Sequence, residues 1–541
     1  MTGVCYVCLK VEGIQAFLFV TGKLKEMIGA SECVRAFTDT LLEKTCRELG
    51  LEILDLQTQK EELLKAVTPH NGKWVCLQQQ SAGTLRCVLA DEGRAKDFVT
   101  QFSCLALEMY PGLPFFGAIQ IGEWNVEGLE RARRALDYKI QCQRAEFGVP
   151  CGMPQIPFAE TAPLDGLPAV GKEKTARPGE NSYISLPSQT RRDISLLAAA
   201  NERLKNTHNK SLCAILKACG FDQLSAEDIR WTDDMDDMLA KCKKKRLALI
   251  HMDGNDLGKL FQDALKKQQG GPEVRQQKLA DLSKSIENAV DAAFVAALEA
   301  VVTKDARQSG QTQAGYTVPL RPLVLGGDDV TVITRADVAL PFVRAFTSAF
   351  ELETAKHGHR CSMGAGMVIM PVGYPFAKAW TLCDDLCKNA KKKTIDMEKR
   401  PSSLDWLVLT SDVEDSVSTL RERTAKAADG KALTCKPFIL DDAFAGFLRH
   451  GEMVLDSLPR SHVREAVELC RAGEVAARPA YDKLRENVSR GLGGRHDEKS
   501  LSEADFYEIF PQSFFCYGSD KACPLADWLE LTHLGIGESH A

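Results

Sequence analysis

The chain has 541 residues, of which 44% are hydrophobic and 26% charged, and its formal net charge is −6. This length allows about three or four domains, and the composition is that of a globular protein with a sizeable core. No stretch approaches the ~20 uninterrupted apolar residues of a membrane-spanning helix. The N-terminus also lacks the basic-then-apolar pattern of a secretory signal. We therefore expect a cytoplasmic protein without membrane attachment, and the acidic charge argues against nucleic-acid binding over the whole surface.

The 19 cysteines are scattered, and most lie in apolar segments. Cys5 and Cys8 are three apart on an expected strand, so their side chains point to opposite faces. Cys383 and Cys387 are four apart on an expected helix, but no second pair is placed to complete a tetrahedral zinc site. We interpret the cysteines as reduced thiols that pack in a core, as is usual in a reducing compartment.

The first 125 residues alternate between strand and helix patterns. An apolar strand leads through a turn at Gly13 into helix, and two further strands flank the small residues "SAG" at 81–83. A helix and another strand follow. The expected elements are strand 4–11, helix 23–49, strands 73–80 and 84–90, helix 92–110 and strand 114–122.

Residues 150–240 have a different character. The stretch 151–187 is rich in Pro and Gly, which is typical of a long irregular connection with little regular structure. A polar helical stretch follows at 196–220. The acidic run 233–237 and the basic run 241–246 are most simply interpreted as solvated surface.

From residue 245 the first pattern returns, so the chain contains an internal repeat of one topology. The hairpin tip differs between the copies: it is "SAG" in the first and "GGDD" at 326–329 in the second. The remainder, 411–541, has mainly helical patterns. The expected elements of the second copy are strand 245–253, helices 257–267 and 279–302, strands 319–325 and 330–334, helix 339–358, strand 361–370, helix 376–393 and strand 402–409.

Acidic residues end two segments of this second copy. Asp253 ends the apolar strand "LALIHMD", and Asp328 and Asp329 follow Gly326 and Gly327 at the hairpin tip. Alone, the GGDD sequence would most simply be a turn. In a strand–helix unit followed by a hairpin, however, the first strand and the hairpin strands are neighbours, so the three carboxylates should meet.

Three clustered carboxylates repel one another unless cations hold them. Two oxygen-ligated Mg²⁺ or Mn²⁺ ions would do so, and would align a hydroxyl nucleophile with a phosphate for in-line displacement. The helix that begins near Gly258 offers its N-terminal N–H groups to phosphate oxygens. Lys259 and Lys391 could neutralise a leaving pyrophosphate, although both have the alternative interpretation of exposed helix lysines.

These motifs resemble the palm of the large subunit of type III CRISPR effector complexes, the CRISPR polymerase/cyclase family, which is kin to the GGDEF diguanylate cyclases. The matching segments are "HMDGNDLGKLF" at 251–261, "LVLGGDDVTVI" at 323–333 and the strand and helix that end in Ala390-Lys391. The N-terminal "VEGIQAFLFVTGKLKEMIGAS" at 11–31 is similar to the family's first palm. The resemblance covers roughly residues 1–125 and 245–410.

The resemblance implies an α+β fold with two ferredoxin-like palm domains that form a pseudo-dimer. The first palm, 1–150, would be degenerate and hold the acceptor nucleotide. An irregular and helical linker domain, 151–244, would separate it from the second palm, 245–410, and a C-terminal helical domain, 411–541, would follow.

The resemblance also implies a function and a set of site residues. The second palm would convert ATP to a cyclic oligoadenylate or cyclic dinucleotide in antiviral defence, with Asp253, Asp328 and Asp329 as ligands of two Mg²⁺ or Mn²⁺ ions. The expected partners are ATP, other CRISPR effector subunits and guide or target RNA, or else the enzyme is freestanding or homo-oligomeric. The expected nucleotide-binding residues are Gly254, Asn255, Gly258, Lys259, Gly326, Gly327 and Lys391.

The sequence departs from the family's pattern in several places. It begins directly at the first palm without an HD nuclease domain, and its His496-Asp497 pair lies in a polar loop. The stretch 157–170 lacks the cysteines of a zinc cluster. Asn255 stands where the family has a second Asp, and we interpret the next residue, Asp256, as a helix cap.

Three other functions stay open at this point. A non-catalytic scaffold that binds guide RNA and partner subunits would not need the clustered carboxylates. A template-using polymerase would need a basic cleft, which the net charge does not favour. A diguanylate cyclase usually pairs two separate chains, whereas here both palms lie in one chain.

Overall fold

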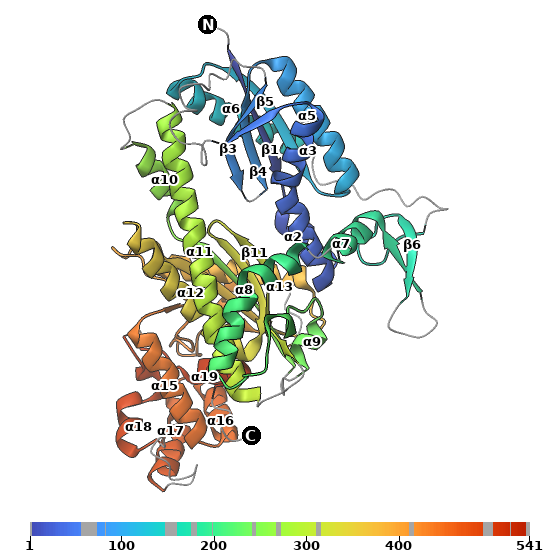
Figure 1. Cartoon of the computed structure of the whole chain (residues 1–541). Coiled ribbons are helices and arrows are strands. Elements are labelled where there is room, and N and C mark those ends of the chain that lie inside the picture. The colour runs from blue at the N-terminus through green and yellow to red at the C-terminus, as the bar shows by residue number, and fades with distance from the viewer. Residues whose placement is uncertain are drawn as a thin grey trace. The chain divides into compact units, whose positions relative to one another are not determined.

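The structure is a computed structural model (Figure 1). It describes residues 3–55, 73–81, 83–146, 160–174, 181–196, 199–240, 245–266, 272–309, 315–410, 416–490, 501–519 and 521–536. The His496-Asp497 pair and most of the basic run 241–246 lie outside these residues.

The chain divides into two compact units, and each draws on several separate segments. The first consists of 1–207, 256–290 and 323–328, and the second of 208–255, 291–322 and 329–541. The chain therefore passes between the units several times, and two of the passages fall at Asn255–Asp256 and Asp328–Asp329.

The first unit contains a five-stranded sheet of order β2-β3-β4-β1-β5. Strand β1 is almost fully buried and pairs antiparallel with both β4 and β5, which makes it a central strand. Helix α6 packs on one face through Ala132, Leu136 and Ile140. The strands are β1 (Val4–Val11), β2 (Glu52–Asp55), β3 (Trp74–Ser81), β4 (Thr84–Leu89) and β5 (Phe115–Gly122).

The helices of this first palm follow the expected order with one difference. The predicted helix 23–49 is divided at Asp39, because the Thr38 hydroxyl donates back to Arg35 O (3.0 Å) and Asp39 pairs with the Arg35 guanidinium. Such local side-chain bonds compete with the helical backbone ladder. The helices are α1 (Ile14–Phe19), α2 (Leu24–Thr38), α3 (Thr40–Glu48), α5 (Glu92–Met109) and α6 (Val126–Glu146).

The segment predicted to be irregular contains more structure than expected. Strands β6 (Ala169–Lys174) and β7 (Asn181–Ser185) form an antiparallel hairpin, so this part of the prediction is wrong. Helix α7 (Leu186–Leu196) then packs on α2, where Ser188 and Arg192 bind the buried Glu26 carboxylate. The apolar and polar residues of this hairpin alternate only weakly, so the sequence pattern does not indicate its two strands. Helix α8 (Ala199–Ala218), strand β8 (Ile229–Arg230) and helix α9 (Met235–Leu239) follow.

The second palm contains the six-stranded sheet β11-β12-β9-β13-β14-β15. Strand β9 pairs antiparallel with β12 and β13, and β13 pairs parallel with β14. The strands are β9 (Arg246–Gly254), β10 (Tyr316–Thr317), β11 (Leu320–Gly326), β12 (Asp329–Arg335), β13 (Met363–Pro371), β14 (Ser403–Val408) and β15 (Phe438–Ile439). The connecting helices are α10 (Leu257–Lys266), α11 (Pro272–Ser309), α12 (Ala336–Lys356) and α13 (Phe376–Thr394).

The strand orders confirm the internal repeat. The order β3-β4-β1-β5 in the first sheet corresponds to β11-β12-β9-β13 in the second: each is a hairpin, then the first strand, then the strand after the second helix. Both sheets are those expected of palm domains in an α+β protein.

The C-terminal residues are helical, as predicted. Helices α15 to α19 lie together (Figure 1). The Trp528 ring of α19 contacts Phe447, Phe510 and Tyr517. The helices of this part of the chain are α14 (Val417–Thr424), α15 (Asp442–Ser457), α16 (Arg460–Arg471), α17 (Glu474–Ser489), α18 (Glu503–Ile509) and α19 (Leu525–Leu531). Among the helices described, none is both long and apolar enough to span a lipid bilayer.

Candidate active site

The GGDD sequence forms the tip of the hairpin between β11 and β12. Gly326 ends β11, Gly327 and Asp328 form a two-residue turn, and Asp329 begins β12. Gly327 has φ 59°, and Asp328 has negative φ. A positive φ at the first turn residue favours Gly there, because Gly has no Cβ. A Cβ added at either glycine would meet nothing within 4 Å, so the backbone at the tip is open to a ligand.

Asp253 lies at the end of β9 that adjoins this hairpin tip. The antiparallel register pairs Val330 with Met252, so the next residues at that end are Asp329 and Asp253. On its other side Asp253 pairs with Gly364 of β13. Opposed residues on neighbouring strands have Cβ atoms only ~5 Å apart. The structure thus brings two of the predicted metal ligands together, and Asp328 precedes Asp329 in the turn.

Lys391 of α13 reaches the Asp253 carboxylate. Its ammonium forms an ion pair with Asp253 Oδ2 and donates to Gly254 O at 2.8 Å. The Lys391 side chain is 18% exposed and that of Asp253 41%. The lysine stem passes over Gly364, where an added Cβ would collide with Lys391 Cγ. The sequence prediction that Lys391 belongs to the site is consistent with this position, although here its partner is a carboxylate.

Asp329 has an oxygen without a hydrogen bond. Its Oδ1 is buried and has no hydrogen-bond partner. His251 Nδ1 lies 3.4 Å from this oxygen and 3.3 Å from Thr331 Oγ1. A buried carboxylate oxygen without a donor is costly in a folded protein. It therefore points to a ligand that this oxygen binds.

One face of α13 lies along β9 beneath these carboxylates. Trp380 contacts the His251 ring, Asp384 Oδ1 lies 3.9 Å from His251 Nε2, and Lys391 reaches Asp253. The Cys383 and Cys387 thiols donate to Gly366 O and Gly364 O, each at 3.2 Å, so both cysteines pack in the core as predicted. Burial raises the pKa of the Cys387 thiol to about 12.

The residues after Asp253 have different positions. Asn255 is buried, and its backbone N and Nδ2 donate to Ser362 O and Oγ at 2.8 and 2.9 Å, so it fixes β9 to the start of β13. Asp256 has φ 57°, and its carbonyl accepts the first helical bond of α10 from Leu260 N at 3.0 Å. Gly258 and Lys259 are exposed in the first turn of α10. The nucleotide-binding roles of Asn255, Gly258 and Lys259 stay predictions.

The two predicted metal ligands on β9 and β12 fit a divalent cation. Carboxylate oxygens are the ligands that Mg²⁺ and Mn²⁺ prefer. Asp329 Oδ1 accepts no hydrogen bond in the structure, and His251 Nδ1 lies 3.4 Å from it. Within the described part of the chain, no group of three or more His, Cys, Asp or Glu side chains is arranged to hold a metal ion. The full ligand set of Asp253, Asp328 and Asp329 therefore stays a prediction.

The structure adds residues that the sequence analysis did not select. His251 and Thr331 face each other across β9 and β12, and Asp384 lies on the adjoining face of α13. A signal for His251 was present, since residues two apart on a strand share a face and His251 precedes Asp253 by two. The signal for Asp384 required the packing of α13 to be known.

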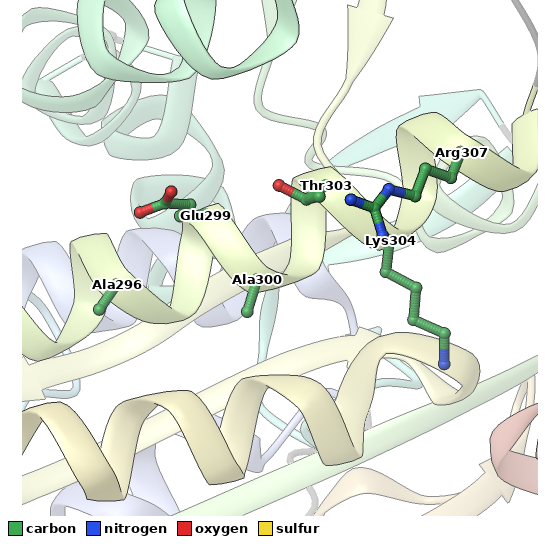
Figure 2. Close-up of a pocket in the computed structure, with 6 residues that line it drawn as sticks. All are labelled: Ala296, Glu299, Ala300, Thr303, Lys304 and Arg307. Atoms are coloured by element: carbon green, nitrogen blue, oxygen red, sulfur yellow. The ribbon is translucent and has the colours of Figure 1, made fainter. Parts of the chain in front are cut away.

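A separate hollow of about 580 Å³ lies along the C-terminal half of α11 (Figure 2). Figure 2 shows its small side chains, Ala296 and Ala300, beside the longer Glu299, Lys304 and Arg307. None of the predicted site residues lines it. It is therefore distinct from the carboxylates of the hairpin tip.

Comparison with known families identifies the second palm. Residues 246–398 match the family model described as Cas10/Cmr2, second palm domain. The match contains Asp253, the GGDD hairpin and Lys391, so the resemblance drawn from these motifs is confirmed for this part of the chain. No curated protein sequence matches the chain significantly.

Solved structures share the fold across nearly the whole chain. A structure titled "Crystal structure of Csm1 in T.onnurineus" is 12% identical, with a TM-score of 0.54, and the match covers 99% of this chain and 70% of that one. The Csm1-Csm4 cassette in complex with cA4 is 11% identical, with a TM-score of 0.53, and the match covers 99% of this chain and 70% of that one. The cassette in complex with pppApA is 11% identical, with a TM-score of 0.52, and the match covers 99% of this chain and 69% of that one. At these identities the likeness shows a Cas10-like fold.

Proposed function

We propose that this chain is a nucleotidyl cyclase that joins ATP molecules into a cyclic oligoadenylate or a cyclic dinucleotide in CRISPR-type antiviral defence. The observation that carries the proposal is a pair of neighbouring carboxylates, Asp329 at the hairpin tip and Asp253 at the adjoining end of β9. The buried Oδ1 of Asp329 accepts no hydrogen bond. The match to the Cas10/Cmr2 second palm supports it, since that palm family often includes cyclases. Similar structures of the Csm1-Csm4 cassette are complexes with cA4 and with pppApA.

In the proposed reaction the residues of the second palm would have three separate roles. Asp253, Asp328 and Asp329 would hold two Mg²⁺ or Mn²⁺ ions, which lower the pKa of a hydroxyl nucleophile and stabilise charge on phosphate oxygens when bound. Gly326 and Gly327 leave the backbone at the tip open to the donor nucleotide. Lys391 would exchange its Asp253 partner for phosphate oxygens of ATP, so that its charge balances the leaving pyrophosphate.

The reaction is the transfer of a nucleotidyl group between two ATP molecules. A ribose hydroxyl of the acceptor attacks the α-phosphorus of the donor, a P–O bond forms, and the bond to pyrophosphate breaks. The hydroxyl proton leaves to solvent or to a carboxylate of the site. Repetition and closure on the first ribose give a ring, and the first palm, whose "SAG" tip lacks acidic residues, would hold the acceptor.

The likeness to Csm1-Csm4 structures supports a partner subunit of the Csm4 kind as a candidate. Guide or target RNA is a further candidate partner, which only the resemblance of the sequence motifs implies. The alternative is a scaffold that holds RNA and partner subunits without synthesis. The difference between the two lies in whether the hairpin carboxylates bind cations and ATP.

The deciding experiment incubates the purified chain with ATP, and with mixed NTPs, in Mg²⁺ or Mn²⁺, and identifies products by mass spectrometry. The Asp328→Ala/Asp329→Ala double variant serves as the control. We expect a cyclic product from the unmodified chain alone. If there is none, calorimetry with Mn²⁺ and ATP decides: binding that depends on the aspartates indicates a cyclase that awaits its partners or RNA, and no such binding contradicts the proposal in favour of the scaffold.

A further inference from the structure

His251 lies beneath the carboxylates of the hairpin tip and belongs to none of the predicted roles. It precedes Asp253 by two residues on β9, so the strand pleat places both side chains on the same face. The register pairs it with Thr331, which follows Asp329 by two on β12. His251 is only 6% exposed, so its ring is a fixed part of this face.

Each ring nitrogen of His251 faces an acidic side chain. Nδ1 lies 3.4 Å from Asp329 Oδ1, the oxygen that has no hydrogen-bond partner, and 3.3 Å from Thr331 Oγ1. On the opposite edge Nε2 lies 3.9 Å from Asp384 Oδ1. The Trp380 ring, 5.8 Å away between centroids, packs against the imidazole.

Helix α13 fixes this imidazole from behind. Asp384 is itself held by Lys388, whose Nζ lies 2.5 Å from Asp384 Oδ2. The resulting row runs from Lys388 through Asp384 and His251 to Asp329. In metal sites such outer partners orient the ligating side chains, and their loss typically weakens metal binding about 10- to 100-fold.

We propose that His251 is a positioning residue that sets the orientation of the Asp329 carboxylate at the hairpin tip, and that Asp384 and Trp380 fix the imidazole. The proposal rests on the proposed function, because it assigns His251 a role toward the predicted metal ligand. It does not depend on a change in the protonation of His251. The ring acts through its position between α13 and β12.

The test compares three substitutions of His251 in the full chain. His251→Phe keeps a ring and removes both nitrogens. His251→Asn keeps a polar group near the Nδ1 position toward Asp329, and His251→Gln keeps one near the Nε2 position toward Asp384. His450→Phe makes the same change at a histidine of the C-terminal helices, where Nδ1 lies 3.1 Å from Tyr517 Oη, and is the matched control.

Two measurements are made on each variant: Mn²⁺ affinity by calorimetry with MnCl₂ and no nucleotide, and hydrogen exchange of peptides that cover 323–333. We expect His251→Phe to bind Mn²⁺ about 10- to 100-fold more weakly and to exchange faster at the hairpin tip. His251→Asn should recover both properties better than His251→Gln, and His450→Phe should change neither. A merely structural role would make Asn and Gln equivalent.

Failure of this inference can be told apart from failure of the proposed function. If Mn²⁺ binding by the unmodified chain does not depend on Asp329, the proposed metal site fails, and hydrogen exchange alone then decides the role of His251. Unchanged exchange at the tip in His251→Phe overturns the inference. Where Mn²⁺ does bind, unchanged affinity in that variant overturns it as well.

Discussion

Gly364 determines whether Lys391 can reach Asp253. It pairs with Asp253 across β13 and β9, and the lysine stem fills the space where its side chain would be. We expect Gly364→Ala to push Lys391 away from the carboxylate. If Lys391 also binds the triphosphate, the loss of one charged hydrogen bond, about 1.5–3 kcal/mol, raises the KM for ATP by roughly 10- to 100-fold. Steady-state kinetics of product formation measure this.

Two variants serve as controls for that prediction. Lys391→Met should raise KM by a similar factor without the crowding, and the double variant should show little further loss. Gly366→Ala places a methyl group against Cys383 O and 2.6 Å from Cys387 N, which are backbone atoms that cannot move aside. It should lower the thermal midpoint much more than Gly364→Ala. A Gly364→Ala variant with unchanged KM would contradict the role given to Lys391.

His208 predicts a pH dependence of stability. Its ring is buried against Phe294 and Trp231, its Nδ1 has no hydrogen-bond partner, and burial lowers its pKa. The unfolded chain therefore binds a proton at His208 at a higher pH than the folded chain does. The stability that the buried, neutral His208 allows is fully present above pH ~6.5, the pKa of an unperturbed histidine. It is lost as the pH falls below that value, so the free energy of unfolding decreases with falling pH.

Denaturant titrations at a series of pH values between 5 and 8 test this. His208→Phe keeps the aromatic contacts and removes the titration, so we expect a smaller decrease of stability toward acid pH. Some dependence should persist, because burial also lowers the pKa of His450. An equally steep decrease in the variant would show that other groups account for it.

The hairpin as an element depends on the left-handed residue at its tip. Gly327 has φ 59° and open space around it, so an alanine there would meet no neighbouring atom and would cost only backbone strain. We expect Gly327→Ala to lower the free energy of unfolding by about 1–2 kcal/mol. Gly326→Ala, also in open space but without positive φ, should cost less, and Gly327→Asn should fall between them. Equal losses in the two alanine variants would exclude this backbone explanation.

Most elements of both palms could be predicted from the sequence, because their strands are apolar runs closed by clear turn residues. The repeat of strand, helix, hairpin, helix and strand was visible in this pattern, and the strand orders confirm it. The break at Asp39 was missed, because side-chain bonds of Thr38 and Asp39 rather than a Gly or Pro end the helix. The β6–β7 hairpin was missed because its residues alternate weakly.

The site could be predicted only in part. Asp253 and Asp329 meet as expected, because the strand order follows from the topology. The ion pair between Lys391 and Asp253, and the row from His251 to Asp384, depend on how α13 packs across β9. That packing rests on Gly364 and Gly366, where the missing side chains admit the helix. No local pattern specifies it.

In the second unit as a whole, strand β14 of the second palm packs with the C-terminal helices. Lys436 is buried between Glu530 (2.5 Å) and Asp527 (3.3 Å). Burial opposes its charge, but the two carboxylates outweigh burial and raise the pKa of Lys436. Trp406 of β14 donates to the same Glu530 at 2.8 Å. A buried ion cluster thus joins the sheet to α19.

Lys436→Met would leave the buried Asp527 and the half-buried Glu530 without their cation. Breaking a buried pair in this way typically costs about 3–5 kcal/mol. We expect faster hydrogen exchange in β14 as well as in α19, because both depend on the cluster. Lys483→Ala removes an exposed pair with Glu465 and should cost at most about 1 kcal/mol. Loss of protection confined to α19 would show that the helices unfold independently of the palm.

The strand order of the second sheet has a consequence during synthesis. Strand β9 is central and largely buried, yet its partners β12 and β13 begin about 75 and 110 residues later in the chain. At ~5–20 residues per second, the ribosome needs roughly 5–20 s to supply the second partner. During that time the apolar segment "LALIHM" of β9 has no partner strands to pair with. An unpaired apolar strand of this kind aggregates or binds chaperones. The strand that carries Asp253 is thus also a part of the nascent chain that needs protection.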